Sequence, residues 1–194
     1  MIDFESIQIN RLKDKSSPSN TKLLDYIRTW WLLKNPRVSA GNHITLKKGV
    51  KLSVCETGKL SLGDYCFIHE NVYFLLTMPK PKVTIGKWVF IGRDTIIASK
   101  NLVTIGDYTI FAPNCYVIDH EHGFSKSDVI LNQKSLLKET KIGRDCYLGT
   151  GAIVLGGISI GDGSVIGANS VVTHDVPSYE IWAGNPAKFI KRRE

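Results

Sequence analysis

Residues 142–172 read IGRDCY-LGTGAI-VLGGIS-IGDGSV-IGANSV-V, and this stretch decides the fold. An aliphatic residue opens each of its five groups of six, and glycine follows that residue in four of them. A period of six does not fit an amphipathic α-helix, in which apolar residues recur every three or four positions. It fits a short strand, a corner and another short strand, so three groups, or eighteen residues, would close one triangular coil.

The same pattern recurs along most of the chain. Runs with a step of six start at Leu62, Ile85 and Ile105, and a fainter one starts at Val38, because Ile44 and Leu62 are again eighteen residues apart. A single coil cannot hide its apolar residues, so such coils must stack. We therefore predict an all-β parallel β-helix over residues 41–177, followed by a C-terminal basic tail, residues 178–194.

The cysteines fit the same repeat. Cys66, Cys115 and Cys146 each stand four residues after an aliphatic residue, where the other groups carry small or β-branched residues. We therefore expect them to be buried packing residues rather than nucleophiles or ligands. The absence of a C-x-x-C motif, of a signal peptide at the acidic start and of an apolar run long enough for a membrane span favours the reducing cytoplasm.

The composition is that of an ordinary soluble domain, with 43% hydrophobic and 22% charged residues among 194. The net charge of +7 is spread along the chain. It comes with no helix-turn-helix pattern, no paired Cys/His zinc spacing and no RNP-type aromatic motif, so no nucleic-acid partner is expected.

Two segments interrupt the repeat. The larger, residues 119–141, opens with Asp119-His120-Glu121-His122-Gly123 and lacks apolar periodicity. The smaller, residues 77–82, contains two prolines, which favour a corner loop. Because loops on a regular scaffold often carry function, the larger one is the first place to look for a site.

Residues 1–40 are expected to form an N-terminal arm and a helix. Residues 22–34 have helical spacing, with Asn20 or Thr21 as the cap. We expect this helix to cover the open end of the β-helix, and the alternative is peripheral contact with a membrane surface or a membrane-bound partner. Its apolar side would consist of Leu23, Leu24, Ile27, Trp30 and Trp31.

The hexads, the histidine-containing loop and the ending Gly184-Asn185-Pro186-Ala187-Lys188 together resemble the hexapeptide-repeat acyltransferases. Within that family the chain looks most similar to galactoside and maltose acetyltransferases and to O-acetyltransferases of bacterial surface polysaccharides. The resemblance implies a left-handed β-helix, a homotrimer, and acetyl-CoA as co-substrate in a groove between neighbouring β-helices, with no metal.

The resemblance also assigns candidate site residues. The family's catalytic histidine stands where the interrupting loop begins, which is the position of His120, with His122 as second choice. The CoA contacts carried over from the family are Thr150, Ala168, Thr173, His174, Lys188 and Lys191. His174 departs from the family, where lysine commonly follows the threonine.

A sugar hydroxyl is a poor nucleophile at neutral pH, and a neutral imidazole can remove its proton as it attacks a thioester. His120 would be this general base, and Asp119 or Glu121 could orient its ring. Together with the resemblance, these residues imply an acetyl-CoA-dependent O-acetyltransferase that acts by direct transfer on a sugar or glycan acceptor in polysaccharide biosynthesis.

Three alternatives stay open at this point. The acceptor could be the amine of an amino sugar, which would make the protein an N-acetyltransferase. The β-helix could instead be a metal-dependent hydratase of the carbonic anhydrase type, with His69, His120 and His122 as zinc ligands. It could also be a scaffold without catalytic activity, in which the histidine-rich loop has no chemical role.

Overall fold

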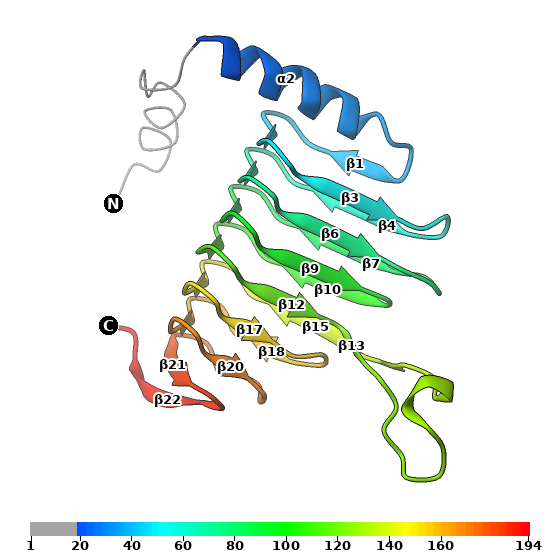
Figure 1. Ribbon diagram of the computed structural model, residues 1–194. Helices are drawn as coiled ribbons and strands as arrows, with labels where there is room; N and C mark the ends of the chain where they lie inside the picture. Colours follow the sequence, from blue (N-terminus) through cyan, green and yellow to red (C-terminus); the bar gives the residue numbers. More distant parts are fainter. Residues whose placement is uncertain (1–18) are drawn as a thin grey trace.

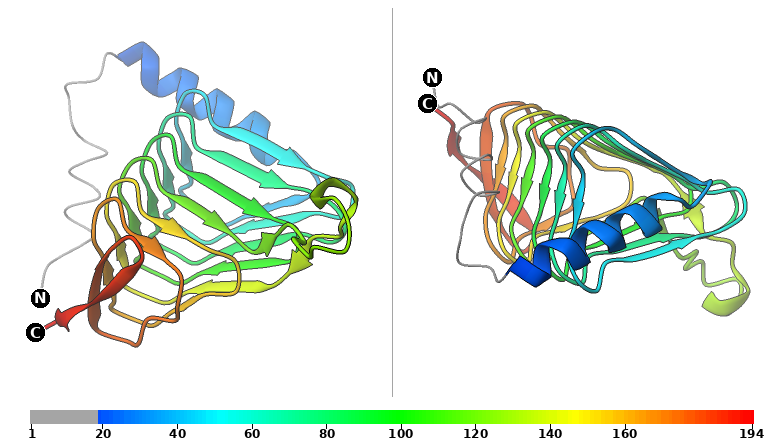
Figure 2. Two further views of the ribbon diagram at one scale, coloured as in Figure 1. Left: turned by 60° about the horizontal axis from the view of Figure 1, so that its bottom comes forward. Right: turned by 90° about the horizontal axis from the view of Figure 1, so that it is seen from above.

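The computed structural model describes residues 19–194. Its body is a left-handed parallel β-helix of six coils, shaped as a triangular prism, with one helix lying across the end of the first coil (Figures 1 and 2). The prediction of an all-β, left-handed parallel β-helix with a short helical cap is confirmed.

Each coil runs over the three faces of the prism in a fixed order, and we name these faces A, B and C. Face A consists of β1 (Val38–Ala40), β4 (Lys59–Leu62), β7 (Lys82–Ile85), β10 (Leu102–Ile105), β15 (Glu139–Ile142) and β18 (Ser159–Ile160). Face B consists of β2 (Thr45–Leu46), β5 (Phe67–Ile68), β8 (Phe90–Ile91), β11 (Ile110–Phe111), β16 (Tyr147–Leu148), β19 (Val165–Ile166), β21 (Glu180–Gly184) and β22 (Ala187–Arg192). Face C consists of β3 (Lys51–Val54), β6 (Tyr73–Leu76), β9 (Ile96–Ser99), β12 (Tyr116–Ile118), β17 (Ile153–Val154) and β20 (Val171–Val172).

The aliphatic residue of each group of six points into the prism. In the last two coils Ile142 stacks on Ile160, Leu148 on Ile166 and Val154 on Val172, each pair eighteen residues apart. All six side chains are at most 1% exposed. Successive side chains of a strand point in opposite directions, so the residues between the buried ones point out of the prism.

The run of six-residue groups predicted to start at Val38 has the wrong register, because the prediction assumed that Ile44 stacks on Leu62, eighteen residues later. Ile68 stacks on Leu46 and Leu62 on Ala40, so each residue of the first coil lies 22 positions before its partner in the second. The corner between β3 and β4 holds four residues, which lengthens this coil. Ile44 and Val50 therefore stand in the rows of Cys66 and Val72 and not in the aliphatic rows.

The helix α2 (Ser19–Leu33) covers the first coil, but not with the residues that the sequence predicts. Thr29 is buried, and its hydroxyl accepts a hydrogen bond from the backbone N–H of Leu46 at 3.0 Å, while Leu32 and Leu33 pack against the core. Leu23, Leu24, Ile27, Trp30 and Trp31 lie on one side of the helix, as predicted, but that side points to solvent. The side that meets the coils instead carries Thr29, which pairs with the backbone N–H of Leu46.

Among residues 19–194, no helix is long and apolar enough to cross a membrane. The helix α2 has 15 residues, which corresponds to a length of about 22 Å at 1.5 Å per residue.

The three cysteines of the repeat are buried, as predicted. Burial raises the pKa of Cys66, Cys115 and Cys146 to about 11, well above the ordinary value of 9.0. The nucleophilic form of a thiol is the thiolate, so these side chains are poor nucleophiles at neutral pH.

We expect only Cys55, which is half-buried, to react with a thiol reagent in the native protein at pH 8. The measurement is titration with Ellman's reagent in buffer and again in denaturant, where all four thiols should react. Rapid native modification of a second thiol, traced by mass spectrometry to Cys115, would contradict the burial described above.

Candidate functional site

The larger interrupting loop leaves the prism at the corner between faces C and A, the C/A corner, after β12. Its stem is a two-stranded antiparallel sheet of β13 (His120–Glu121) and β14 (Leu136–Leu137), and its outer part contains the short 3-10 helix η1 (Ile130–Asn132). The loop projects away from the coils (Figure 1). Beyond it, β15 stacks on β10 without a shift, so the next coil continues the prism.

A buried carboxylate stands at the base of this loop. Asp119 is fully buried, and its two oxygens accept hydrogen bonds from the Ser99 hydroxyl at 2.5 Å and from the backbone N–H groups of Lys100 and Asn101 at 2.8 and 2.9 Å. Such a bonded carboxylate is held in one orientation. The end of β9, one coil earlier, therefore fixes the first residue of the loop.

The fourth partner of Asp119 is the imidazole of His120. The Nδ1 atom lies 3.0 Å from Asp119 Oδ1, and the side chain is 17% exposed. A carboxylate can only accept, so Nδ1 carries the hydrogen and Nε2 keeps its lone pair. In the neutral ring, Nε2 is therefore the nitrogen that can accept a proton, and the ring lies at the C/A corner.

The neighbouring loop residues are placed differently. Glu121 forms an ion pair with Lys138 at 3.1 Å and does not contact the His120 ring. His122 is exposed, and among the residues that the structure describes its side chain has no hydrogen-bonding partner. Of the two acids considered as orienting groups, Asp119 is the one that touches the imidazole.

The six residues expected to contact CoA do not gather in one place on the chain but fall into three groups. Thr150 and Ala168 lie on stacked corners between faces B and C, the B/C corner, whereas Thr173 and His174 follow β20 at the C/A corner. The third group, Lys188 and Lys191, lies on β22, which pairs with β21 and forms the last strand of face B.

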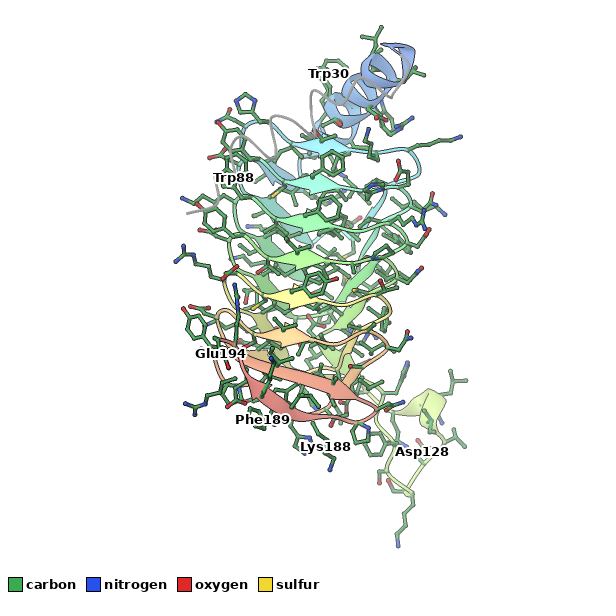
Figure 3. The ribbon with its side chains drawn as sticks, turned by 90° about the vertical axis from the view of Figure 1, so that its left-hand side faces the viewer. Trp30, Trp88, Asp128, Lys188, Phe189 and Glu194 are labelled. Carbon is green, nitrogen blue, oxygen red and sulfur yellow. The ribbon has the colours of Figure 1, made fainter. Side chains whose placement is uncertain are left out.

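Of the basic residues on β22, Lys188 lies nearest the B/C corner. It stands opposite Ala183, next to Gly184, whose N–H donates to the hydroxyl of Ser170 at that corner. Lys191 stands opposite Ile181, toward the other end of the strand. Figure 3 shows Lys188 and Phe189 at the end of the molecule opposite Trp30.

The residues of the tail and the B/C corner suit the phosphates of a nucleotide-containing ligand. Lys188, Lys191 and Arg192 are exposed and, within residues 19–194, none of them has an acidic partner, whereas Arg193 is paired with Asp145 at 3.0 Å. Gly149 and Ala168 keep the neighbouring corner small. Only Lys188 of these cations lies beside that corner, and an ammonium group without an acidic partner is a suitable donor for a phosphate oxygen.

The three histidines of the metal-dependent alternative are not brought together within one chain. His69 follows β5 on the second coil, near the B/C corner, whereas His120 and His122 stand at the C/A corner after the fourth. In the described part of the chain, no group of three or more His, Cys, Asp or Glu side chains has the arrangement of a metal site.

Three residues of the site were not identified from the sequence. Ser99, Lys100 and Asn101 supply the donors that hold Asp119, yet they lie about one coil away from it in the chain. The signal was present, because Ile97 and Val117 are stacked partners twenty residues apart, and counting twenty back from Asp119 leads to Ser99. Hexad spacing alone does not indicate which corner residues carry hydrogen bonds.

Comparison with protein families gives one match. Residues 139–174 match the family described as bacterial transferase hexapeptide (six repeats). These residues cover β15 to the end of the sixth coil, which is the most regular part of the prism.

Relatives that match over most of the chain carry acetyltransferase names. The Escherichia coli K12 protein WbbJ, named for O-acetyl transfer in lipopolysaccharide biosynthesis, is 38% identical over 80% of this chain and 71% of its own length. A Mycobacterium tuberculosis protein named as an acetyltransferase is 30% identical over 87% of this chain. The chain spans only 57% of the length of that relative.

Solved structures share the architecture. AntD, an N-acyltransferase from Bacillus cereus crystallised with dTDP and 3-hydroxybutyryl-CoA, superposes with a TM-score of 0.74 over 85% of this chain and 88% of its own. Its sequence identity of 18% makes this a similarity of fold alone.

Proposed function

The chain belongs to the hexapeptide-repeat acetyltransferases, and from that premise we propose that it transfers the acetyl group of acetyl-CoA to a hydroxyl of a sugar or polysaccharide precursor. The observation that carries the proposal is the buried Asp119 carboxylate bound to Nδ1 of His120. This pair leaves Nε2 as a base at the surface, beside a loop long enough to shape an acceptor site.

His120 is the proposed general base. Its Nε2 atom takes the proton of the acceptor hydroxyl while the oxygen attacks the thioester carbonyl, so that the new C–O bond forms as the C–S bond breaks. Acetyl-CoA supplies the activated acyl group and a thiolate leaving group. The proton on His120 then passes to that thiolate, and Asp119 stabilises the imidazolium in between without taking up the proton itself.

We propose that acetyl-CoA binds between two copies of the chain. One chain presents its expected contact residues in three separate groups, and a groove between neighbouring prisms can collect groups from both sides. The site would then be incomplete in an isolated chain.

The outer faces of the prism support a homotrimer. The central outward row of face A is polar, whereas those of faces B and C are largely aliphatic and aromatic, and surfaces of that kind are typical of subunit interfaces. The rows are Ser39, Ser61, Thr84, Thr104, Lys141 and Ser159 on face A, Thr45, Phe67, Phe90, Ile110, Tyr147 and Val165 on face B, and Lys51, Tyr73, Ile96, Tyr116, Ile153 and Val171 on face C, so the polar members of faces B and C come from the first coil. Sedimentation equilibrium tests the homotrimer directly. A monomer at micromolar concentration would contradict both the homotrimer and the acetyl-CoA site between two chains.

The four cysteines are unpaired, which supports the reducing cytoplasm as the proposed place of action.

Calorimetric titration with acetyl-CoA and with CoA tests the proposed activity first. We expect micromolar binding with one site per chain, followed by acceptor-dependent release of free CoA thiol. The acceptor screen should pair each neutral sugar with its amino-sugar analogue, because faster turnover of the amine would replace O-acetylation by N-acetylation. Absence of binding at millimolar CoA would overturn the proposal.

Lys188→Ala/Lys191→Ala should weaken CoA binding by about tenfold or more, because charge-assisted hydrogen bonds to phosphate are among the stronger polar contacts. The calorimetric dissociation constant is the readout. Lys59→Ala/Lys82→Ala, a pair that is also exposed and lies on face A outside the proposed interface, is the matched control and should bind normally. Equal weakening in both variants would point to a general charge effect.

A further inference from the structure

The helix α2 carries an exposed apolar surface that no other part of residues 19–194 covers. At 100° per residue, Leu23, Leu24, Ile27, Trp30 and Trp31 fall within an arc of about 120°. Each is more than half exposed, and Trp31 reaches 69%. Thr29, Leu32 and Leu33, which contact the coils, lie on the other side of the helix.

We propose that this surface, the outer face of α2, docks the protein onto an anionic lipid bilayer. The inference does not rest on the proposed acetyl transfer. Indole side chains favour the boundary between hydrocarbon and headgroups, because the ring is apolar and its N–H can stay hydrated. A helix of 15 residues is too short to span a bilayer, so it would lie in the plane of the interface.

The charge around α2 complements such a surface. Residues 23–58, which form most of α2 and the first coil, contain six Lys or Arg and two acids, a net charge of +4 out of +7 for the whole chain. One of the two acids, Asp25, is already neutralised by Arg28 and Lys47 at 2.7 and 2.8 Å. The positive charge of this end of the chain, with little competing negative charge, favours an anionic headgroup layer.

Cations and indoles also meet directly at this end of the molecule. The ammonium group of Lys34 lies 3.6 Å from the centre of the Trp30 ring. Trp31, Lys34 and Arg37 line one hollow that is open to solvent. A headgroup phosphate seated there could contact both cations while the indole enters the acyl region beside it.

The test uses the full chain and vesicles that contain equal parts of phosphatidylcholine and phosphatidylglycerol, with pure phosphatidylcholine for comparison. We expect co-sedimentation with the anionic vesicles, a blue shift of the tryptophan emission, and weaker binding as salt is raised. Trp30→Ala/Trp31→Ala should reduce the binding by at least about tenfold, since two large apolar contacts are lost. It should also remove the blue shift, because Trp88 and Trp182 lie on the coils.

The matched control is Ile130→Ala/Leu131→Ala, a second exposed apolar pair, located on the projecting loop. It should bind vesicles like the unchanged protein, and the urea midpoint of both variants should stay near that of the parent. Loss of binding in the control instead of the tryptophan variant would overturn the proposal. Absence of co-sedimentation with the anionic vesicles would also overturn the proposal. The occupant of the surface would then be either residues 1–18 or a second copy of the chain. A second copy is indicated if the tryptophan variant has a lower mass than the parent in sedimentation.

Discussion

His120→Ala should lower kcat by roughly 10²–10⁴-fold while the dissociation constant of acetyl-CoA stays within about twofold of the parent value, the range for loss of a general base. The reason lies in the geometry of the loop stem. Nε2 is the one nitrogen of the ring that can accept a proton, because Asp119 occupies Nδ1. Single-turnover thiol release and calorimetry measure the two quantities separately.

His122→Ala is the matched control for this substitution. It removes the same side chain two residues further along, from an exposed position outside the Asp119 contact. Its kcat should stay close to that of the parent. A large loss in His122→Ala and a small one in His120→Ala would exchange the two assignments, and little change in either would leave the loop without a histidine base.

Asp119→Asn should lower kcat by on the order of 10²–10⁴-fold with little change in KM, the size of effect expected when an orienting carboxylate is lost. The two oxygens of Asp119 serve four donors, and an amide replaces one oxygen with an NH₂ group that must face two of them. The ring of His120 is then free to turn or to take the other tautomer.

Urea unfolding shows whether Asp119→Asn loses activity through the position of His120 or through a less stable fold. Leaving buried donors without an acceptor costs about 1–3 kcal/mol, which urea unfolding of Asp119→Asn should detect. The assays are therefore run far below the unfolding midpoint. Asp128→Asn, an exposed acid on the same loop that does not contact His120, should change neither kcat nor the midpoint. A kcat of Asp119→Asn equal to that of the parent would remove the positioning role.

The regular part of the prism could be predicted because its spacing carries the information. In the run from Ile142 to Val172 every sixth residue is buried, and a single period accounts for all of them. The first coil was placed out of register because a four-residue corner shifted Ile44, and hexad counting cannot see corner length.

The corners and the cap could not be predicted for different reasons. Tyr65 and Trp88 have positive φ angles of 60° and 59°, which is rare for aromatic residues, and their rings stack at 4.2 Å. That contact joins residues more than twenty positions apart, so no local rule reveals it. Likewise, the apolar spacing of α2 indicated a helix correctly but not which side would meet the coils, since the hydroxyl of Thr29 decided that.

The projecting loop lies between two coils that stack as if it were not there: Leu102 is opposite Glu139 and Ile105 is opposite Ile142. The chain can therefore lengthen, shorten or exchange residues 122–134 at the modest entropic cost of a longer loop, which grows only with the logarithm of its length. Asp119 would keep its position, because its carboxylate accepts hydrogen bonds from the preceding coil, and His120 would stay in place through its contact with Asp119 and the pairing of β13 with β14. Descendants of such a gene could thus acquire new acceptors by trading one loop for another, with the same chemistry retained at its base.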